Sequence, residues 1–409
     1  GYSIGYQRNF GNVTYNVLFN PPNYAVVDLI SGSNFGTIPA TAANFGPLSG
    51  ASGSAALPAS ELRAVNPHIP QAYAHLFSTS LEHQFFQNHH LELDYSGSVG
   101  VHLYDIANEN FPGTGNVYLG IPCTPGSCVA PLNPQYGNIN VRGGNAISNY
   151  NAMNVRYDIQ DISHTGITLR MNYTWSHAID ELSDTFSASG NQFNLGYTDP
   201  FNPHLDYGDA EFDNRHRVVL SMVYAVPFFR HTSGIAKYLL DGWQFAPIFS
   251  ARTGAPYSIY DLTNAANVYP RLMYPGALGM TSNVPRSLTG ANTYQVFNIT
   301  GATTYANPIT GNSDFGPYPS DMTGRDIFRL PGTWNLDAGL YKETKITERV
   351  NLQLRLEAYN VFNHANFGVN IGGAYIFGGS GVITGGYGLL PGGTYGDNRN
   401  VQLGLKVIF

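Results

Sequence analysis

Charge and long hydrophobic runs are both scarce in this sequence. Asp, Glu, Lys and Arg make up only 11% of its 409 residues, against roughly a quarter in an ordinary soluble domain. The richest apolar stretch, residues 218–229, is interrupted by Ser221 and Pro227, and no run approaches the roughly 18 apolar residues of a transmembrane helix. The absence of long apolar runs excludes a helical membrane protein. The low fraction of charged residues is also unlike that of a water-soluble globular protein.

Basic clusters are missing as well. The formal net charge is -7, and no group of Lys and Arg residues stands together in the sequence. Because binding of nucleic acid depends on a basic face that neutralises phosphates, we expect no nucleic-acid partner. The chain starts at Gly1 without a charged and then apolar leader, so any secretory signal is expected to have been removed or to lie on another segment.

Only two cysteines occur, Cys123 and Cys128, and they flank a Pro-Gly turn. Such a turn brings two Cys residues close enough for a local disulfide, as in the loops of proteins from oxidising compartments. Two free thiols are the alternative. No His residue or second Cys pair stands beside them, so we expect no metal site there.

Aromatic residues and strict alternation of apolar and polar residues are what the sequence has in abundance. Tyr and Phe number 28 and 23. Segments of about ten residues alternate with a period of two, and this is the length with which a tilted strand crosses a bilayer. Alternation also explains the mean hydropathy of -0.16, because barrel strands set lipid-facing apolar residues against lumen-facing polar ones. The clearest segments are 167–176, 333–342, 350–362 and 400–409.

Charged residues in the middle of these strands fall on the polar face. This arrangement indicates a barrel in which charges face water in the lumen while the other face meets lipid. A β-sandwich also alternates, so strand length, rather than alternation alone, favours the barrel. The expected lumen-facing residues are Arg170, Asn172, Gln353, Arg355 and Glu357.

Weaker strand patterns bring the expected number of strands to about ten. We therefore predict an all-β fold in which residues 1–409 form the C-terminal part of an antiparallel transmembrane β-barrel. The sequence shows no domain linker and no internal repeat of fixed period. The weaker strand segments are 3–9, 72–83, 90–104, 151–160, 216–226 and 243–253.

Short and long connections alternate between these strands. Residues 158–165 and 344–349 are tight turns, whereas 105–150, 179–213 and 253–332 are long and rich in Gly, Pro, Asn and Ser. Long extracellular loops and short periplasmic turns are typical of outer-membrane barrels. A Gly-rich stretch at 372–393 is expected to be a further loop. Aromatic residues near strand ends fit interfacial girdles, and a hydrophobic core is their alternative; they are Trp175, Trp243, Trp334 and Phe362.

Signatures of catalysis are missing. The nearest approach to a nucleophile elbow is Gly311-Asn312-Ser313, but the closing Gly316 comes one residue too late. The segment 379–381 lacks the third glycine and the following helix pattern of a phosphate-binding loop. We therefore expect no enzyme activity and no cofactor.

Histidines and one acidic segment are the remaining candidates for a metal site. His83, His89 and His90 cluster near an expected hairpin turn, but adjacent strand residues point to opposite faces, so we expect a solvated turn. The segment 199–213 has the residue types of a calcium loop without the spacing of an EF-hand. We expect a solvated acidic loop, whose carboxylates are Asp199, Asp206, Asp209 and Asp213.

An ordered series of short motifs resembles the C-terminal barrel of Oar-like TonB-dependent receptors. Each motif is modest by itself, but together they follow the family's order from about Tyr73 to Phe409. The motifs are Asn149-Tyr150-Asn151-Ala152-Met153, Tyr173-Thr174-Trp175-Ser176-His177, Phe212-Asp213-Asn214-Arg215-His216-Arg217, Gly242-Trp243-Gln244 and Arg355-Leu356-Glu357-Ala358-Tyr359-Asn360-Val361-Phe362-Asn363-His364.

This resemblance implies a barrel of about 22 strands, closed by a plug and energised through a TonB box. The sequence departs from that pattern, because no plug, TonB box or carboxypeptidase-regulatory-like domain is recognisable. The resemblance also implies an assembly signal at the end of the chain. Leu405, Val407 and Phe409 form it, with a chance apolar strand end as the alternative.

The favoured hypothesis is a TonB-dependent receptor or transporter that moves a large or scarce substrate across the bacterial outer membrane. Its expected partners are outer-membrane lipid, the barrel-assembly machinery and the TonB system, reached through a segment outside this sequence. The alternative is a structural or adhesive surface assembly, because unsatisfied edge amides must be completed by strands of other chains. A third hypothesis is a secreted β-sandwich that binds glycans through Tyr and Trp.

Overall fold

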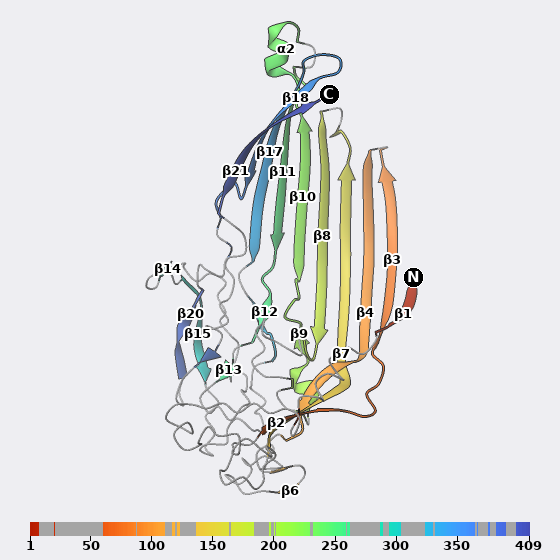
Figure 1. Cartoon of the computed structure of the whole chain (residues 1–409), viewed down its shortest axis with the longest axis vertical. Helices are drawn as coiled ribbons and strands as arrows, with labels where there is room; N and C mark the ends of the chain where they lie inside the picture. Colours follow the sequence, from red (N-terminus) through yellow and green to blue (C-terminus); the bar gives the residue numbers. More distant parts are fainter. Residues whose placement is uncertain are drawn as a thin grey trace, which may run out of the picture.

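A computed structural model describes one large sheet and parts of the connections between its strands (Figure 1). The described residues are 1–7, 20, 60–86, 88–110, 117–118, 121–122, 136–162, 165–183, 196–197, 200, 202–229, 232–258, 260–261, 287–288, 294–303, 324–329, 332–364, 366, 375–376, 382–389 and 398–409.

The large sheet has 12 strands. Its main path runs β1-β3-β4-β7-β8-β10-β11-β17-β18-β21, and every pair along this path is antiparallel. Each main strand therefore pairs with the next main strand in the sequence, which is an up-and-down meander. Two further strands join at the side, β2 parallel to β7 and β9 antiparallel to β8. The sheet is not closed, and β1 and β21 are its edges.

The strands of the large sheet are β1 (Tyr2–Tyr6), β2 (Ser60–Val65), β3 (Tyr73–Phe85), β4 (His89–Asn108), β7 (Tyr136–Ile159), β8 (Ile167–Asp180), β9 (Gly208–Asp209), β10 (His216–Ala225), β11 (Trp243–Arg252), β17 (Thr333–Lys345), β18 (Asn351–Tyr359) and β21 (Asn400–Ile408). The smaller elements are β5 (Val117–Tyr118), β6 (Ile121–Pro122), the 3-10 helix η3 (Pro203–Asp206), the helix α2 (Ile235–Leu240), β12 (Pro256–Tyr257), β13 (Tyr260–Asp261), β14 (Ser287–Leu288), β15 (Tyr294–Thr303), β16 (Phe328–Arg329), β19 (Tyr375–Ile376) and β20 (Val382–Leu389).

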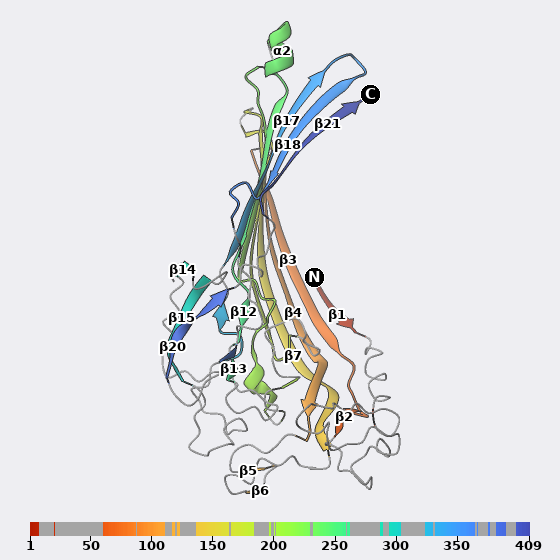
Figure 2. The same cartoon turned by 60° about the vertical axis from the view of Figure 1, so that its left-hand side comes forward.

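The two ends of the sheet differ in the length of their connections. At one end, which we call the turn end, β3 leads to β4, β7 to β8 and β17 to β18 through short turns, and α2 lies between β10 and β11. The C-terminus lies at the same end (Figure 1). At the other end, which we call the loop end, β4 leads to β7, β8 to β10, β11 to β17 and β18 to β21 through long connections. Seen from another side, the sheet is strongly twisted (Figure 2).

Strand register sorts the side chains onto two faces. Residues directly opposite each other on neighbouring strands share a face. Leu356 lies opposite Leu340 and Leu403, whereas Arg355 lies opposite Tyr341 and Gly404. The same parity continues across the other strands, with Leu220 opposite Met171 and Phe249 on one face. We call the two faces the apolar face and the polar face.

Glycines with positive φ close two of the turns. Gly166, directly before β8, has φ 78°, and Gly242, directly before β11, has φ 77°. A Cβ at either position would also meet a backbone carbonyl oxygen, that of Ala225 or of Glu343. Only glycine accepts this backbone without strain, so these residues fix how the strands at the turn end are joined.

The turn-end part of the sheet has almost no apolar core. Buried apolar side chains gather instead near the loop end, for example Ile106, Ala146 and Ala178. On the apolar face, Leu81 is 65% exposed and Leu403 is 73% exposed. A contiguous exposed apolar surface of this size indicates contact with a membrane or another apolar phase. Among the residues that the structure describes, no helix is long and apolar enough to span a bilayer.

The ten predicted strands correspond to the ten strands of the main path, with shifted bounds. The largest shifts concern β4 and β7, which continue to Asn108 and back to Tyr136 through residues predicted as loop. The loop prediction for 105–150 was therefore wrong at both of its ends. The reason is tertiary, because the extension of β7 pairs with both the extension of β4 and the parallel strand β2. The predicted loops at 253–332 and 372–393 also contain strands, and β15 pairs with β20.

Candidate functional site

A chain of ion pairs crosses the polar face near the turn end. Arg156 on β7 lies 3.5 Å from the Glu92 carboxylate on β4, measured from Nη1 to Oε2, and 2.8 Å from Asp158, measured from Nη2 to Oδ2. Arg170 on β8 donates from Nε to Oδ1 of Asp158 at 2.7 Å. These side chains come from three neighbouring strands at alternate positions. The charges therefore satisfy one another along the wall rather than across a buried core.

A second polar group lies on the same face across β17, β18 and β21. The Tyr341 hydroxyl donates to Oε1 of Glu357 at 3.0 Å, and the Gln402 amide donates to Oε2 of the same carboxylate. Arg355 donates from Nε to Oε1 of Gln353 at 2.7 Å. Its guanidinium carbon lies 6.0 Å from the centre of the Tyr341 ring, as in a cation–π contact. The group thus forms a continuous hydrogen-bonding surface.

All five residues predicted to face a lumen lie on the polar face. Asn172 lies between Arg156 and Val219 in the register, and Arg170 lies between Asp158 and Ser221. The structure brings Arg170 into the ion-pair chain. It brings Gln353, Arg355 and Glu357 into the second group. That this face borders a lumen stays a prediction.

The apolar face carries rings and aliphatic side chains at the same strand positions. The segment from Val401 to Val407 sets its apolar residues opposite those of β18. The three residues of the predicted assembly signal are exposed, and Phe409 follows the last strand at the turn end. Their recognition by the assembly machinery stays a prediction. Their exposure means that no partner within the described part of the chain covers them.

A cationic side chain marks the turn-end rim of the apolar face. Lys342 lies opposite Trp243 in the register, and its Nζ is 6.0 Å from the centre of the indole ring. The ammonium group donates to the Glu343 carbonyl oxygen at 3.1 Å and to the Thr344 hydroxyl at 2.9 Å. A long side chain that lays its stem on an apolar surface and turns its charge toward polar groups is typical of a membrane interface.

Buried ion pairs hold the loop end together. The Arg325 side chain is only 4% exposed, and its Nη1 lies 2.6 Å from Oδ1 of Asp180. The same guanidinium donates to the carbonyl oxygens of Asp180 and Asp206, at 2.8 and 3.1 Å, and to the Ser183 hydroxyl. Asp326 accepts from the Ser258 hydroxyl at 2.8 Å. The segment around Arg325 is therefore fixed against the end of β8, far away in sequence.

A second charged cluster adjoins the first. Arg329 pairs with Asp209 and Asp213, and the Asp213 side chain is fully buried. Arg215 pairs with both carboxylates, and Nε2 of His177 lies 2.7 Å from Oδ1 of Asp209. The prediction of a solvated acidic loop was wrong for Asp206, Asp209 and Asp213. Asp206 and Asp213 are buried, and Arg215 and Arg329 pair with the carboxylates of Asp209 and Asp213. Asp199 lies outside the described residues.

Sequence reasoning missed Arg325 and Arg329 entirely. They stand in a long connection without periodicity, and no spacing pattern links them to residues more than a hundred positions away. The acidic segment was the only available signal. Where a segment rich in carboxylates binds no metal, arginine or lysine side chains from other parts of the chain are the expected partners.

Two further buried carboxyl groups, those of Asp105 and Glu181, lie at the loop end. Asp105 accepts from the Asn145 backbone N–H at 3.0 Å and from the Tyr197 hydroxyl at 3.2 Å. Burial raises the pKa of Asp105 above its usual value, and burial raises that of Glu181 as well. The pKa of Tyr197 is also raised, by burial and then by the charge of Asp105. A strand crosses a bilayer in about ten residues, so Asp105, late in the long strand β4, lies outside the spanning part.

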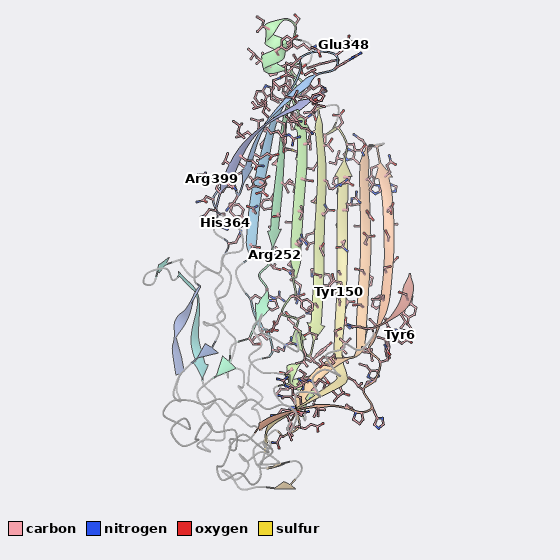
Figure 3. The ribbon with its side chains drawn as sticks, in the orientation of Figure 1. Tyr6, Tyr150, Arg252, Glu348, His364 and Arg399 are labelled. Carbon is pink, nitrogen blue, oxygen red and sulfur yellow. The ribbon has the colours of Figure 1, made fainter. Side chains whose placement is uncertain are left out.

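A hollow of about 520 Å³ lies where five strands reach the loop end. Its wall includes Arg217 at the start of β10, Arg252 at the end of β11 and Asn400 at the start of β21. Figure 3 labels Arg252 at the loop end of its strand. In the register Arg217 and Arg252 face each other directly. The two arginines thus occupy directly opposite strand positions at the mouth of the polar face.

The strand register separates the histidine candidates. His89 and His90 start β4 rather than forming a turn, and they lie on opposite faces, because His89 pairs with Phe85 and His90 with Gln84. Nδ1 of His89 lies 2.7 Å from the Tyr157 hydroxyl. Within the residues that the structure describes, no group of three or more His, Cys, Asp or Glu residues could hold a metal ion. Cys123 and Cys128 lie outside the described residues, and their disulfide stays a prediction.

An antiparallel meander with one polar face and one exposed apolar face is typical of the class of membrane-spanning β-barrel proteins. Residues 1–402 match the family described as outer membrane beta barrel domain. The chain belongs to this family, and its location is the bacterial outer membrane. No match is found among curated proteins.

Several solved structures resemble the chain at low identity. The outer membrane transporter YddB from Escherichia coli is 10% identical with a TM-score of 0.44, covering 86% of this chain and 34% of YddB. The FpvAI-pyocin S2 complex is 8% identical with a TM-score of 0.38, covering 83% of this chain and 28% of that one. The siderophore receptor PiuA from Acinetobacter baumannii is 11% identical with a TM-score of 0.15, covering 83% and 56%. The chain spans about a third of the length of the first two.

Proposed function

We propose that the chain forms part of an outer-membrane transport barrel that moves a large or scarce substrate across the membrane. The observation that carries this proposal is the contrast between the two faces of one sheet. Ionisable side chains such as Arg156, Asp158 and Arg170 line one face in mutual contact, while the opposite face exposes leucines and aromatic rings. A closed barrel of such strands encloses a polar passage and meets lipid outside.

The polar face is the transport wall in this proposal. Arg170, Asn172, Gln353, Arg355 and Glu357 hydrogen-bond to a solute or to a plug that fills the lumen. They position groups rather than react with them, so the protein is not an enzyme and needs no cofactor. The long connections at the loop end, on the extracellular side, capture the substrate first.

The motif series supports a finer assignment to the Oar-like TonB-dependent receptors. In such a receptor, energy from the inner membrane reaches a plug through the TonB system, and plug movement opens the passage. The plug and the remaining strands lie on segments outside this sequence or on other chains. The barrel-assembly machinery recognises the terminal strand with Leu405, Val407 and Phe409.

Growth of the host bacterium tests energised transport. We compare the parent strain, a strain without this protein and a strain without TonB on a panel of limiting iron, vitamin and carbon sources. The expected result is one nutrient on which both deletions give the same growth defect, with no further defect when they are combined. Growth of the protein deletion like the parent on every nutrient for which the TonB deletion is defective contradicts the proposal.

Cysteine accessibility tests which face borders water. In a background with Cys123 and Cys128 replaced by Ser, single cysteines are introduced by Leu354→Cys and Arg355→Cys. A membrane-impermeant maleimide added to whole cells that have a permeabilised outer membrane is expected to label position 355 and not position 354. The reverse pattern contradicts a lumen on the polar face.

A surface assembly is the second candidate, and the free edges of the sheet favour it. Only five residues of β3 pair with β1, and β21 pairs with β18 alone among the described strands. Unpaired edge amides in a membrane call for strands from elsewhere. Disulfide cross-linking in the background without Cys123 and Cys128 distinguishes the candidates, with one cysteine introduced at Leu81 on β3 and one at Leu403 on β21, both on the apolar face. Cross-links between copies favour the surface assembly, and exclusively intramolecular cross-links exclude it.

A further inference from the structure

The hollow at the loop end of the polar face combines an arginine without an acidic partner among the described residues with the amides of Asn398 and Asn400, whose side chains make no hydrogen bond there. Within the described part of the chain, Arg217 makes no ion pair and no side-chain hydrogen bond. The arginines of the neighbouring clusters are held by carboxylates, as Arg329 is by Asp209 and Asp213. Arg217 therefore differs from them in lacking such a partner.

The one carboxylate in the wall of the hollow, that of Asp337, is hydrogen-bonded to groups other than Arg217. Oδ1 of Asp337 accepts from the Asn335 side chain at 2.8 Å and from the backbone N–H of Asn360 at 2.8 Å. Among the described residues Asp337 makes no ion pair with Arg217. Hydrogen bonds within β17 and to the end of β18 thus orient Asp337, so its charge does not cap the guanidinium of Arg217.

The facing arginines give the hollow an affinity for negative charge. Arg217 and Arg252 are directly opposite on β10 and β11, and like charges in that position repel. Nε of Arg252 donates to the Thr333 hydroxyl at 3.1 Å, which fixes the direction of its guanidinium. An anion placed over the pair replaces repulsion by charge-assisted hydrogen bonds. Arginine presents the forked donor geometry that carboxylate and phosphate groups match.

Neutral polar groups surround the cationic corner. Asn398, Asn400 and the Ser250 hydroxyl line the hollow, and their side chains make no hydrogen bond within the described residues. The side-chain carbonyl of Asn335 is likewise available, since only its amide nitrogen donates to Asp337. Amides and hydroxyls offer both donors and acceptors, which are the groups that bind the hydroxyls of sugars.

We infer that this hollow binds an acidic saccharide, with its carboxylate or phosphate on Arg217 and its hydroxyls on the surrounding amides. A volume of about 520 Å³ lies within the range of small-ligand sites. The hollow faces the polar side of the sheet, so the saccharide arrives in solution and not as a membrane lipid. This inference rests on the proposed transport function and names the chemical class of its substrate.

Binding is tested on the natural full-length protein, purified from outer membranes in detergent. Isothermal titration calorimetry at low ionic strength compares glucuronate, glucose 6-phosphate, glucose and inorganic phosphate. We expect glucuronate and glucose 6-phosphate to bind at least tenfold more tightly than either glucose or phosphate alone. Equal affinity for glucose and glucuronate, equal affinity for phosphate and glucose 6-phosphate, or binding of none of the four overturns the inference.

Two variants and a matched control assign the site. Arg217→Gln is expected to lower the affinity for both acidic sugars at least tenfold, and Arg217→Lys to restore part of it. Lys406→Gln removes the same charge from the polar face at the turn end, opposite Gln353, and is expected to change the affinity less than twofold. Equal effects of Arg217→Gln and Lys406→Gln overturn the inference. Heat-modifiable migration on gels verifies that each variant is folded.

The binding experiment and the growth test can fail independently of each other. Binding of the acidic sugars in the absence of any TonB-linked growth defect contradicts transport and leaves the site in place. A shared growth defect without binding of the acidic sugars supports transport and removes the saccharide site.

Discussion

The turn end and the loop end of this sheet are stabilised in opposite ways. At the turn end, regular strand pairing joins neighbouring strands, and apolar side chains such as Leu354 and Leu405 are exposed. At the loop end, buried ion pairs connect segments that are distant in sequence. Arg325 there contacts the Asp180 carboxylate and two backbone carbonyl oxygens. The turn end therefore needs lipid to complete its packing. The loop end completes its own packing with arginine and aspartate.

Removal of the buried guanidinium is expected to have the largest effect, and it affects the loop end alone. Arg325→Met leaves the carboxylates of Asp180 and Asp326 buried without their cation. Loss of one member of a buried ion pair costs roughly 3–5 kcal/mol. Proteinase K is expected to cleave residues 181–213 much faster in the variant, while the heat-modifiable migration of the barrel persists.

The control for this variant is Arg170→Met. Arg170 is ion-paired too, but its side chain is 56% exposed, so its removal should leave the cleavage rate of residues 181–213 unchanged. Equal cleavage of Arg325→Met and the parent protein would show that the buried pairs do not hold the loop end.

A charge on the apolar face is expected to have the second largest effect, and it affects the turn end alone. Leu356 lies in the middle of β18 and is 42% exposed. Leu356→Arg places a guanidinium against hydrocarbon, which costs about 2–4 kcal/mol near the midplane of the bilayer. Urea titration of folding into lipid vesicles measures the loss.

Gln353→Arg is the matched control on the polar face of the same strand. Position 353 lies opposite Glu343 and Lys406, so the new charge meets water, one carboxylate and one ammonium group. Its effect on the folding free energy should be well below that of Leu356→Arg. A larger loss for Gln353→Arg than for Leu356→Arg would reverse the assignment of the two faces.

The third largest expected effect is a pH dependence of proteolysis that is confined to the loop end. Because burial raises the pKa of Asp105 in the folded protein, its stabilising contribution is full below the unfolded pKa and is lost as the pH rises through the folded pKa. Proteinase K should therefore cut the loop end faster at pH 8 than at pH 4, after correction for the rate on an unfolded substrate. Asp105→Asn keeps the acceptor for Asn145 and Tyr197 and should flatten this dependence. An unchanged pH dependence in Asp105→Asn would assign the effect to another group.

The rim lysine is expected to give the smallest effect. Lys342→Met keeps the aliphatic stem on Trp243 but removes the ammonium group and its hydrogen bonds to Glu343 and Thr344. A cation–π contact of this kind contributes about 0.5–1 kcal/mol. The same urea titration in vesicles measures the change, and a loss above that of Leu356→Arg would mean that Lys342 does not lie at the interface.

Prediction from sequence succeeded where side-chain alternation alone decides the structure. The strand at 167–176 was predicted from five apolar and five polar positions, and β8 starts at Ile167 as predicted. Prediction from sequence failed where a structural feature depends on contacts with residues distant in the chain. The extension of β7 to Tyr136 depends on β4 and on the parallel strand β2, and the burial of Asp213 depends on Arg329. No local pattern in the sequence encodes either contact.

The sequence by itself determined the class of fold and the two faces of the sheet. Alternation has a period of two, and the side chains of a strand point alternately to opposite sides, so every residue's face follows from its position. The tertiary structure alone decided the loop end, where Arg325, Arg329 and the hollow at Arg217 are assembled from segments far apart in the chain. The physical reason is that a buried charge is tolerated only beside its partner, and the chain path, rather than the local sequence, brings the partner there.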